Sequence, residues 1–480
     1  MAKKKIRRDC IAFYGHSSED VTGSEYYIQF GKYKILLECG LHQSSSNSYL
    51  ESYRINSAKF KFKPSEIDYV FVNHGHIDHV GMLPRLVNQG FKGKIIAMRD
   101  CAAVMKPLLL NSCYIVQEEA RILSRKFKRE YKPLYEIEDV YKTLSMFEIY
   151  DRFDEIFELN DQIKFQWLKN SHCVGAAQLQ LILFDGSKTK KILYTSDIGA
   201  LNAKNHYVEN TVIPQMFSDV TIMESTYGAN SKNVNVKREQ DLKHLKSAVD
   251  TVIDRGGSII MPCFSFSRTQ ELLTALYTIY GSDGSFKTQV VVDSALSCDI
   301  CKLYSKILVG ENLELWEKVS SWENVRYISE RDESRASMAD DSPRIIISAS
   351  GFCTNGRIVN YLKKYLRDPR SMIVFSGYTG DNQSYLSYRI KNYRDQKYIS
   401  INKERIPNRA DCITLSSFSS HANQKDLITF GSLLNTNKVI LVHGSEESKK
   451  CLSEKMREAI SNNDKSYRVV SASKDMVVYL

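Results

Sequence analysis

The stretch YVFVNHGHIDHVGMLPRL, residues 69–86, places three histidines and an aspartate directly after an apolar run. They are His74, His76, Asp78 and His79, in a chain of 480 residues that has only 10 histidines. In an extended segment, side chains two positions apart lie on one face, so His74 and His76 could bind one metal ion. Asp78 and His79 follow where the chain turns and could face a second ion. Zinc accepts these nitrogen and oxygen ligands, and manganese tolerates them.

A solvated turn is the alternative explanation of this stretch. Packing explains poorly why three imidazoles and a carboxylate crowd together, whereas a dication stabilises all four in their ligating protonation states. Single acids and histidines follow other apolar runs in the same way, namely His172, Asp197, His421 and His443. Each alone is more typical of a capping or core residue. Because the strands of one sheet end along one edge, together they could converge on one site.

Length and composition indicate a soluble globular protein of two or three domains. Hydrophobic residues make up 43% and charged residues 25% of the chain. The sequence has no apolar run long enough to span a membrane and no apolar signal segment after its basic N-terminus. The 11 cysteines lack the spacing of a disulfide framework, so we expect a cytoplasmic protein. The net charge of +10 is compatible with a polyanionic partner but does not decide it.

The pattern of elements changes twice along the chain. Residues up to about 225 predict short strands, with a helical stretch over residues 101–156. A strand–loop–helix rhythm follows and predicts a mostly parallel sheet with helices on both faces. The tail then returns to the first pattern. We therefore predict one α/β domain formed by residues 1–225 and 416–480, interrupted by an inserted domain over residues 226–415.

The order of the motifs resembles a known family. Glu38, H-x-H-x-D-H, His172, Asp197, Glu224, His421 and His443 occur together with ESTYG, FSFSRTQELL, SASGFCTNGRIVNYL, FSGYTGDNQSYLSYRI and FSSHANQKDL. This series resembles the β-CASP group of the metallo-β-lactamase superfamily over nearly the whole chain. Within the group it resembles the RNA-processing members, such as the endonuclease subunit of the cleavage and polyadenylation specificity factor and its prokaryotic homologues. The implied fold is α/β, a metallo-β-lactamase αββα sandwich with an inserted β-CASP domain of mostly parallel sheet.

The resemblance implies a role for each motif residue. One zinc would be bound by His74, His76 and His172, the other by Asp78, His79 and His443, with Asp197 bridging the two. His421 would contact the scissile phosphate or protonate the leaving oxygen, and Glu224 would hold its imidazole. Glu38 would orient a ligand from behind. The implied activity is that of a zinc-dependent endoribonuclease in which two metals activate a bridging hydroxide, leaving a 5′-phosphate and a 3′-hydroxyl. Asp78, His421 and Glu224 are the residues most directly tied to catalysis.

The substrate that the resemblance implies is RNA, which we expect to be single-stranded. RNA-processing members have histidine at the position of His443, where the DNA-repair branch has valine. Loops of the inserted domain supply further candidate RNA-binding residues, namely Arg268, Ser350, Gly351, Gly356, Arg357 and Gly377. Small residues expose backbone N–H groups to phosphate, and arginine adds charge-assisted bonds. Ordinary turns and surface arginines explain these residues equally well.

Three residues depart from the family pattern, and two other functions stay open. Glu38 stands where aspartate is usual, Asn73 where threonine or serine is usual, and Ser196 where glycine is usual. A small-molecule hydrolase of the wider superfamily would have little use for a domain that covers its site. A non-catalytic scaffold is the other alternative, although no metal ligand of the family is missing here. The sequence leaves open a homodimer and partner proteins.

Overall fold

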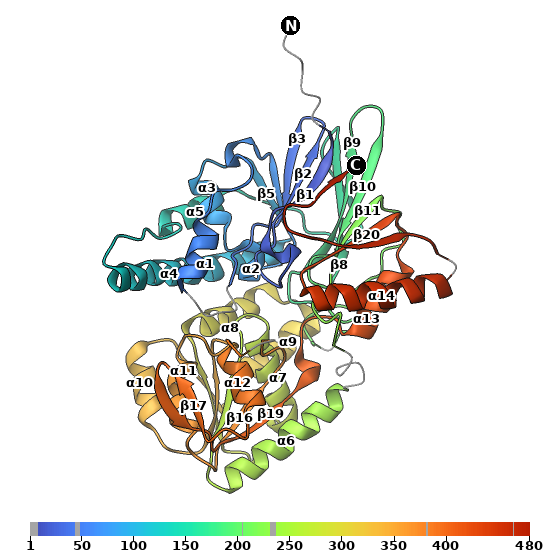
Figure 1. Ribbon diagram of the computed structural model, residues 1–480. Helices are drawn as coiled ribbons and strands as arrows, with labels where there is room; N and C mark the ends of the chain where they lie inside the picture. The colour runs from blue at the N-terminus through green and yellow to red at the C-terminus, as the bar shows by residue number, and fades with distance from the viewer. Residues whose placement is uncertain (1–7, 44–48, 204, 231–236, 381–382, 464) are drawn as a thin grey trace.

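The computed structural model describes residues 8–43, 49–203, 205–230, 237–380, 383–463 and 465–480. Two seven-stranded sheets form its upper part in Figure 1, and a six-stranded sheet lies below them. The first sheet is antiparallel on one side and parallel on the other. Its strands, in spatial order, are β22 (Val477–Tyr479), β1 (Cys10–Phe13), β2 (Tyr26–Phe30), β3 (Tyr33–Leu37), β4 (Tyr69–Val72), β5 (Lys94–Ala97) and β6 (Phe147–Ile149).

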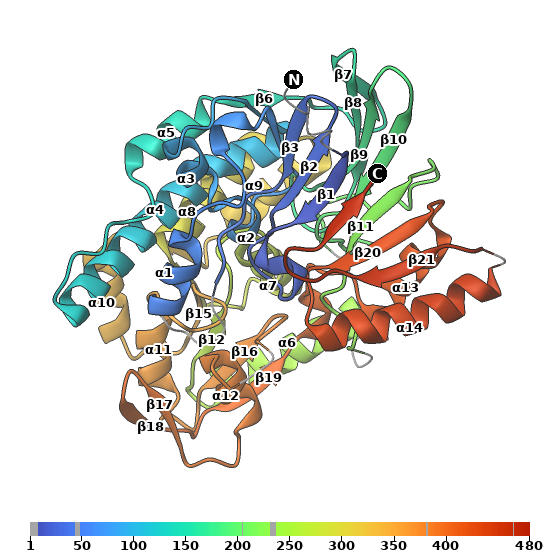
Figure 2. The same ribbon diagram turned by 45° about the horizontal axis from the view of Figure 1, so that its top comes forward.

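Local sequence explains why this sheet begins with a hairpin. β2 and β3 are joined by the two residues Gly31 and Lys32, and Gly31 has a φ of 54°, which glycine adopts without strain. The last strand of the chain, β22, pairs antiparallel with the first, β1, so that both ends of the chain contribute to one sheet (Figure 2).

The second sheet is parallel on one side and antiparallel on the other, and it packs face to face on the first. Phe71 of β4 meets Phe165 and Trp167 of β8, with ring centroids 5.2 and 6.1 Å apart. All three side chains are fully buried, so the two sheets share one core. The strands, in spatial order, are β21 (Arg468–Ser471), β20 (Lys438–Val442), β11 (Val220–Glu224), β10 (Thr189–Tyr194), β9 (Ala177–Phe184), β8 (Ile163–Lys169) and β7 (Ile156–Asn160).

Helices cover the outer faces of both sheets and complete the αββα layers. α4 packs its apolar side chains on the first sheet, while α13 and α14 pack on the second (Figure 1). The predicted fold class is therefore confirmed. The helices of this part are α1 (Tyr49–Ser57), α2 (Ile77–Val80), α3 (Leu83–Asn88), α4 (Arg99–Phe127), α5 (Ile137–Leu144), α13 (Gln424–Leu433) and α14 (Glu446–Asn462).

The third sheet is parallel throughout, as the strand–loop–helix rhythm predicts. α7 and α8 pack on one face and α11 and α12 on the other. Its strands, in spatial order, are β14 (Val325–Ile328), β13 (Gln289–Asp293), β15 (Arg344–Ser348), β12 (Ile259–Pro262), β16 (Met372–Phe375) and β19 (Asp411–Thr414), and a separate hairpin is formed by β17 (Tyr398–Ile401) and β18 (Glu404–Pro407). The helices are α6 (Arg238–Asp254), α7 (Arg268–Tyr280), α8 (Ala295–Ile307), α9 (Gly310–Ser320), α10 (Arg331–Ala339), α11 (Ile358–Tyr365) and α12 (Leu386–Asn392).

The expectation of a continuous helical stretch over residues 101–156 is wrong. α4 ends at Phe127, α5 is a separate short helix, and residues 147–149 form β6. Pro133 lies in the break, where a helix cannot continue unchanged, and β6 completes the parallel edge of the first sheet beside β5. Among the described helices, none combines the length and the apolar character that crossing a membrane requires.

Candidate metal centre

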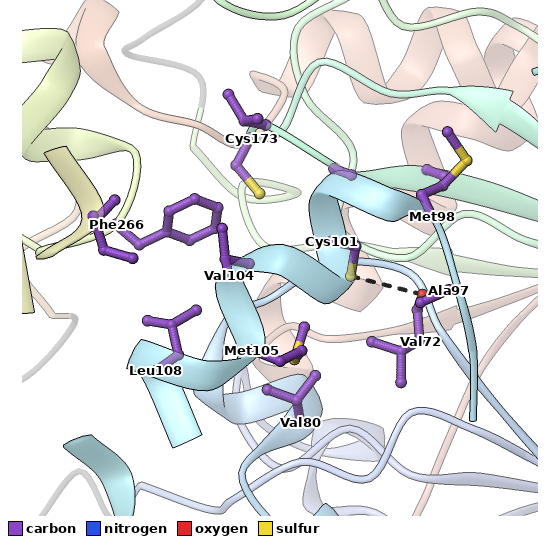
Figure 3. Packing of buried hydrophobic residues seen from close by; sticks show 14 of the residues in the cluster. Val72, Val80, Ala97, Met98, Cys101, Val104, Met105, Leu108, Cys173 and Phe266 are labelled. Carbon is purple, nitrogen blue, oxygen red and sulfur yellow. Dashed lines mark hydrogen bonds between the residues drawn. The ribbon is translucent and has the colours of Figure 1, made fainter. Parts of the chain in front are cut away.

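The loop between β4 and α2 carries the histidines of the opening stretch. β4 ends at Val72, His74 and His76 lie in the loop, and α2 carries Asp78 and His79. The loop lies close against α4, because a Cβ on Gly75 would stand 2.6 Å from Val104 Cγ2. Figure 3 shows Val104 with Met105 and Leu108 along the apolar face of α4, and Phe266, from the loop after β12, beside them. The loop after β12 therefore meets α4 at Val104, the residue against which the histidine loop packs.

One group of ligand atoms joins this loop to the ends of β8 and β10. Nε2 of His172 lies 3.0 Å from Nδ1 of His76. Oδ2 of Asp197 lies 3.6 Å from Nε2 of His74 and 3.6 Å from Nε2 of His172. These four side chains offer ligand atoms that all lie within 4.8 Å of one another.

A second group shares the same aspartate. Oδ1 of Asp197 lies 3.3 Å from Nε2 of His79 and 3.3 Å from Nδ1 of His443. Oδ2 of Asp78 lies 3.4 Å from Nε2 of His443 and 3.7 Å from Nε2 of His79. The two oxygens of Asp197 thus face different ligand groups, which is the arrangement of a carboxylate between two cations.

Several polar atoms here are buried without a hydrogen-bond partner in the described structure. They include His74 Nε2, His172 Nδ1 and Asp197 Oδ1. A buried polar atom without a partner is costly, and in native proteins it indicates a strained or functional group or an ion. The donor set of five histidines and two aspartates fits zinc, which binds imidazole nitrogen and carboxylate oxygen.

The electrostatics of the site also fit cations. Burial lowers the pKa of His74 and His172 well below the usual range and that of His76 to about 4, which keeps these imidazoles neutral and able to bind a metal. Burial also lowers the pKa of His79, but Asp197 and Asp78 outweigh it and hold that pKa well above its usual range. A dication among these carboxylates would take the place of the proton on His79.

Glu38 contacts a histidine of each ligand group, His79 directly and His74 through Ser196. It accepts hydrogen bonds from the Asn73 backbone N–H and the Ser196 hydroxyl, both at 3.2 Å, and lies 3.6 Å from Nδ1 of His79. Ser196 in turn lies 3.1 Å from Nδ1 of His74. Carboxylate partners of this kind fix the tautomer and the ring orientation of a ligating histidine.

The other two departures from the family pattern have a structural account. Ser196 has a φ of 53°, in the left-handed region that glycine adopts freely, and its hydroxyl gains the contacts to Glu38 and His74. The side-chain amide of Asn73 donates to the Ala177 carbonyl at 2.8 Å, and the backbone carbonyl of Asn73 accepts from the Ala177 N–H at 2.9 Å. It therefore ties the end of β4 to the start of β9.

His421 lies beside the two groups and is held by Glu224. Nδ1 of His421 lies 3.0 Å from Oε1 of Glu224, and Nε2 lies 3.9 Å from Oδ2 of Asp197. Glu224 is fixed in place by the backbone N–H groups of Ile198 at 2.7 Å and Thr226 at 2.9 Å. Burial lowers the pKa of His421, while Glu224 and Asp197 outweigh burial and raise it to about 9.

The predicted RNA-binding arginines are already engaged by the protein. Arg268 is buried, forms an ion pair with Glu271 and donates to the Ser420 hydroxyl at 2.9 Å. Arg357 forms an ion pair with Asp293 at 2.6 Å, and Asp293 is fully buried. Both guanidinium groups therefore hold loops together, and direct phosphate contact by either one stays a prediction.

The four small candidate residues lie in loops at the same edge of the third sheet. The Ser350 hydroxyl donates to the Asn355 carbonyl at 3.2 Å. Gly351 lies under the ring of Phe264, which a Cβ would meet at 2.9 Å, and Gly356 has a φ of 80° with no room for a Cβ. Gly377 has a φ of 123° and lies in the loop after β16. Their contact with a substrate is untested and stays a prediction.

Two contacts of the site were not predicted. The Thr226 hydroxyl lies 3.0 Å from Nδ1 of His443, and the Ser24 hydroxyl lies 3.4 Å from Nε2 of His79. Thr226 follows Glu224 within the ESTYG motif, so that motif was the available signal. Ser24 lies in the loop before β2 and has no comparable signal in the sequence.

Three family descriptions match parts of the chain. Residues 269–383 match the Beta-Casp domain, residues 405–466 match the Zn-dependent metallo-hydrolase RNA specificity domain, and residues 15–236 match the Anti-Pycsar protein Apyc1. The second of these ranges contains His421 and His443, and the third contains the remaining candidate metal ligands.

Curated proteins similar to the chain include ribonucleases and a transcription termination factor. Ribonuclease TTHA0252 of Thermus thermophilus is 26% identical over 90% of this chain and 92% of its own length. Transcription termination factor FttA of Methanocaldococcus jannaschii is 26% identical over 92% of this chain and 67% of its own length. Endoribonuclease YSH1 of Candida glabrata is 24% identical over 92% of this chain, which spans 55% of that relative.

A solved structure of a protein of unknown function from Enterococcus faecalis V583 has the same fold over 99% of this chain and 100% of its own. The TM-score is 0.53 at 12% sequence identity.

Proposed function

Because the chain belongs to the β-CASP group of the metallo-β-lactamase superfamily, we propose that it is a zinc-dependent ribonuclease that hydrolyses RNA internally. The observation that carries this function is the Asp197 carboxylate, which turns one oxygen toward each of two complete ligand groups. A shared carboxylate would hold two metal ions close together, as hydrolysis of a phosphodiester by paired metals requires.

We assign the two groups to two zinc ions. His74, His76 and His172 would hold one ion, Asp78, His79 and His443 would hold the other, and Asp197 would serve both. Bound zinc supplies Lewis acidity toward a phosphate oxygen and makes water nucleophilic at neutral pH. Burial keeps the imidazoles of His74, His76 and His172 neutral and ready to bind, while on His79 the ion would take the place of a proton.

His421 is the residue positioned to move a proton. Its Nδ1 is occupied by Glu224, which leaves Nε2 facing the centre beside Asp197. We assign the delivery of a proton to the leaving oxygen to Nε2. Glu224, held by two backbone N–H groups, fixes the tautomer and the orientation of the ring.

RNA is the substrate that best fits the chain, because the RNA specificity domain described for residues 405–466 includes His421 and His443. The alternative of a small-molecule hydrolase does not account for the domain of the third sheet, in which the ring of Phe266 lies 5.6 Å from that of His76 and Arg268 donates to Ser420, next to His421. A non-catalytic scaffold does not account for a full ligand set. The chain covers about half of the fungal relative, so that protein's assemblies are not carried over.

The test is incubation of the zinc-loaded chain with end-labelled unstructured RNA, structured RNA, single-stranded DNA and duplex DNA. We expect zinc-dependent internal cleavage of RNA that leaves 5′-phosphate ends. A matched control replaces the exposed Asp254 with alanine, which should leave cleavage unchanged, and Asp78→Ala should abolish it. Intact RNA at saturating zinc, or equal cleavage by the Asp78→Ala chain, would contradict the proposed function.

A further inference from the structure

Three aromatic side chains lie in the loops that follow three neighbouring strands of the third sheet. β15, β12 and β16 are adjacent and parallel, and they are followed by Phe352, Phe264 and Tyr378 respectively. The carboxyl ends of parallel strands meet at one edge, which is where open α/β sheets bind ligands. We call Phe352, Phe264 and Tyr378 the aromatic row.

Ring contacts connect the aromatic row to the metal centre. The ring centroids of Phe264 and Phe352 are 5.1 Å apart, and those of Phe352 and Tyr378 are 6.0 Å apart. Tyr378 lies 6.3 Å from Tyr227, and Tyr227 lies 6.0 Å from His421. All four contacts are edge-to-face, and the series ends at the residue that we assign as the proton donor.

The side chains of the aromatic row are partly exposed to solvent. Phe264 is 43% exposed although its neighbours Cys263 and Ser265 are buried. Its ring lies over the backbone of Gly351, where a Cβ would approach to 2.9 Å, so glycine allows the ring to lie there. Phe352 and Tyr378 are half-buried. Exposed apolar side chains that gather in one place are a common sign of a binding surface.

The two arginines predicted to bind phosphate at this edge are engaged by the protein. Arg268 and Arg357 follow β12 and β15, but each is paired with a carboxylate of the protein. The edge therefore presents aromatic faces at positions where guanidinium groups were predicted to bind phosphate. Aromatic faces recognise the flat faces of nucleobases, and every base has one.

We infer that the aromatic row binds unpaired bases of the substrate by stacking, an inference that rests on the proposed ribonuclease function. Bases in a duplex are stacked on one another and paired, so their faces are not available to these rings. The row would therefore select single-stranded RNA with little sequence preference and hold it beside His421. We assign base stacking to Phe264 first, because its side chain is the most exposed of the three.

The test measures binding without cleavage, using the full chain with Asp78→Ala and a fluorescein-labelled, unstructured oligouridine. Fluorescence anisotropy gives the Kd of this parent chain and of the same chain with Phe264→Ala, Phe264→Leu or Phe264→Trp. We expect alanine and leucine to weaken binding roughly 5- to 150-fold, the range of one lost base–aromatic stack, and tryptophan to retain it. On an abasic oligomer with the same backbone, all four chains should bind alike.

The matched control is Phe184→Ala at the far end of β9, where the side chain is 42% exposed. It should not change Kd, and circular dichroism should show that each variant is folded. Unchanged binding by Phe264→Ala, full retention by Phe264→Leu, or an equal loss on the abasic oligomer would overturn the inference. If wild type binds RNA with the expected dependence on Phe264 but does not cleave it, the aromatic row stands and the proposed function fails.

Discussion

Replacing His421 with alanine removes the proposed proton donor without removing an assigned zinc ligand. Nδ1 of His421 is bound to Glu224, and Nε2 lies 3.9 Å from the Asp197 oxygen. The geometry also allows a different role, because Asp197, Glu224 and His421 together could hold a metal ion. The variant distinguishes the two roles: loss of a proton donor slows the chemical step, whereas loss of a ligand releases zinc.

The size of the effect follows from what replaces the imidazole. A positioned general acid contributes about 10²- to 10⁴-fold in rate, or about 2.7 to 5.4 kcal/mol at about 1.36 kcal/mol per factor of ten. The His421 side chain is 19% exposed, so water can enter the space and act as a weaker donor. We therefore expect the lower part of that range, a fall of about 10²- to 10³-fold in single-turnover cleavage.

The assay compares two substrates and measures bound zinc. RNA with sulfur in place of the leaving 3′ oxygen expels a thiolate, which needs far less protonation because a thiol is much more acidic than an alcohol. The defect of His421→Ala should shrink at least about tenfold on this substrate if protonation is what was lost. His244→Ala, an exposed histidine on α6, is the matched control and should cleave both substrates normally. Loss of zinc from His421→Ala, or an equal defect on both substrates, would refute the reasoning.

Four further outcomes are expected. Asp78→Ala and His79→Ala should reduce RNA cleavage to background while circular dichroism shows a folded chain, because each removes a proposed zinc ligand. Glu38→Ala should weaken zinc binding about 10- to 100-fold in competition with a chelating dye, since Glu38 supports both ligand groups. Arg357→Ala should lower the free energy of unfolding in urea by about 3 to 5 kcal/mol, because fully buried Asp293 loses its charge partner. Chelation of zinc should lower Tm, since a ligand at a hundredfold excess over Kd stabilises the folded state by about 2.7 kcal/mol.

Matched controls guard these outcomes against general damage. Arg335 is 78% exposed and forms an ion pair with the exposed Asp332, so Arg335→Ala should change the unfolding free energy by less than about 1 kcal/mol. An Arg335→Ala chain as destabilised as Arg357→Ala would contradict the account of Asp293. Full cleavage by Asp78→Ala, zinc binding unchanged in Glu38→Ala, or a Tm that chelation does not move would each contradict the corresponding prediction.

The gathering of the candidate ligands could be predicted because each one follows an apolar strand. Asp197 ends the run that forms β10, and His443 ends the run that forms β20, which are parallel to the intervening β11. Their side chains consequently reach the same edge of one sheet. The assignment of each ligand to one ion remains a prediction, as do the domain boundaries, the cytoplasmic location and the oligomeric state.

Side-chain partners were harder to predict because they depend on packing between distant segments. The sequence marked Arg357 as a candidate for phosphate binding, but it lies beside Asp293, 64 residues earlier in the chain. Nothing in the local sequence indicates which carboxylate an arginine will meet. The partner of Asn73 could not be predicted either, because its side-chain amide donates to the Ala177 carbonyl at the start of another strand.

The aromatic row could not be predicted for a related reason. Phe264, Phe352 and Tyr378 are far apart in sequence, and their contact depends on the spatial strand order β15, β12, β16, which is not the chain order. A repeated pattern of strand, small residue and aromatic residue is visible in the sequence. The three aromatic residues become neighbours only because β15, β12 and β16 are adjacent in the sheet.

The central claim is that RNA cleavage requires a centre of two zinc ions that share Asp197, and a zinc titration tests it most directly. Metal-free chain receives increasing zinc, and the cleavage rate of end-labelled unstructured RNA is followed against zinc bound per chain. We expect little cleavage until the second site fills and a plateau at about two zinc ions per chain. A plateau at about one zinc ion, or RNA that stays intact at saturation, would contradict it.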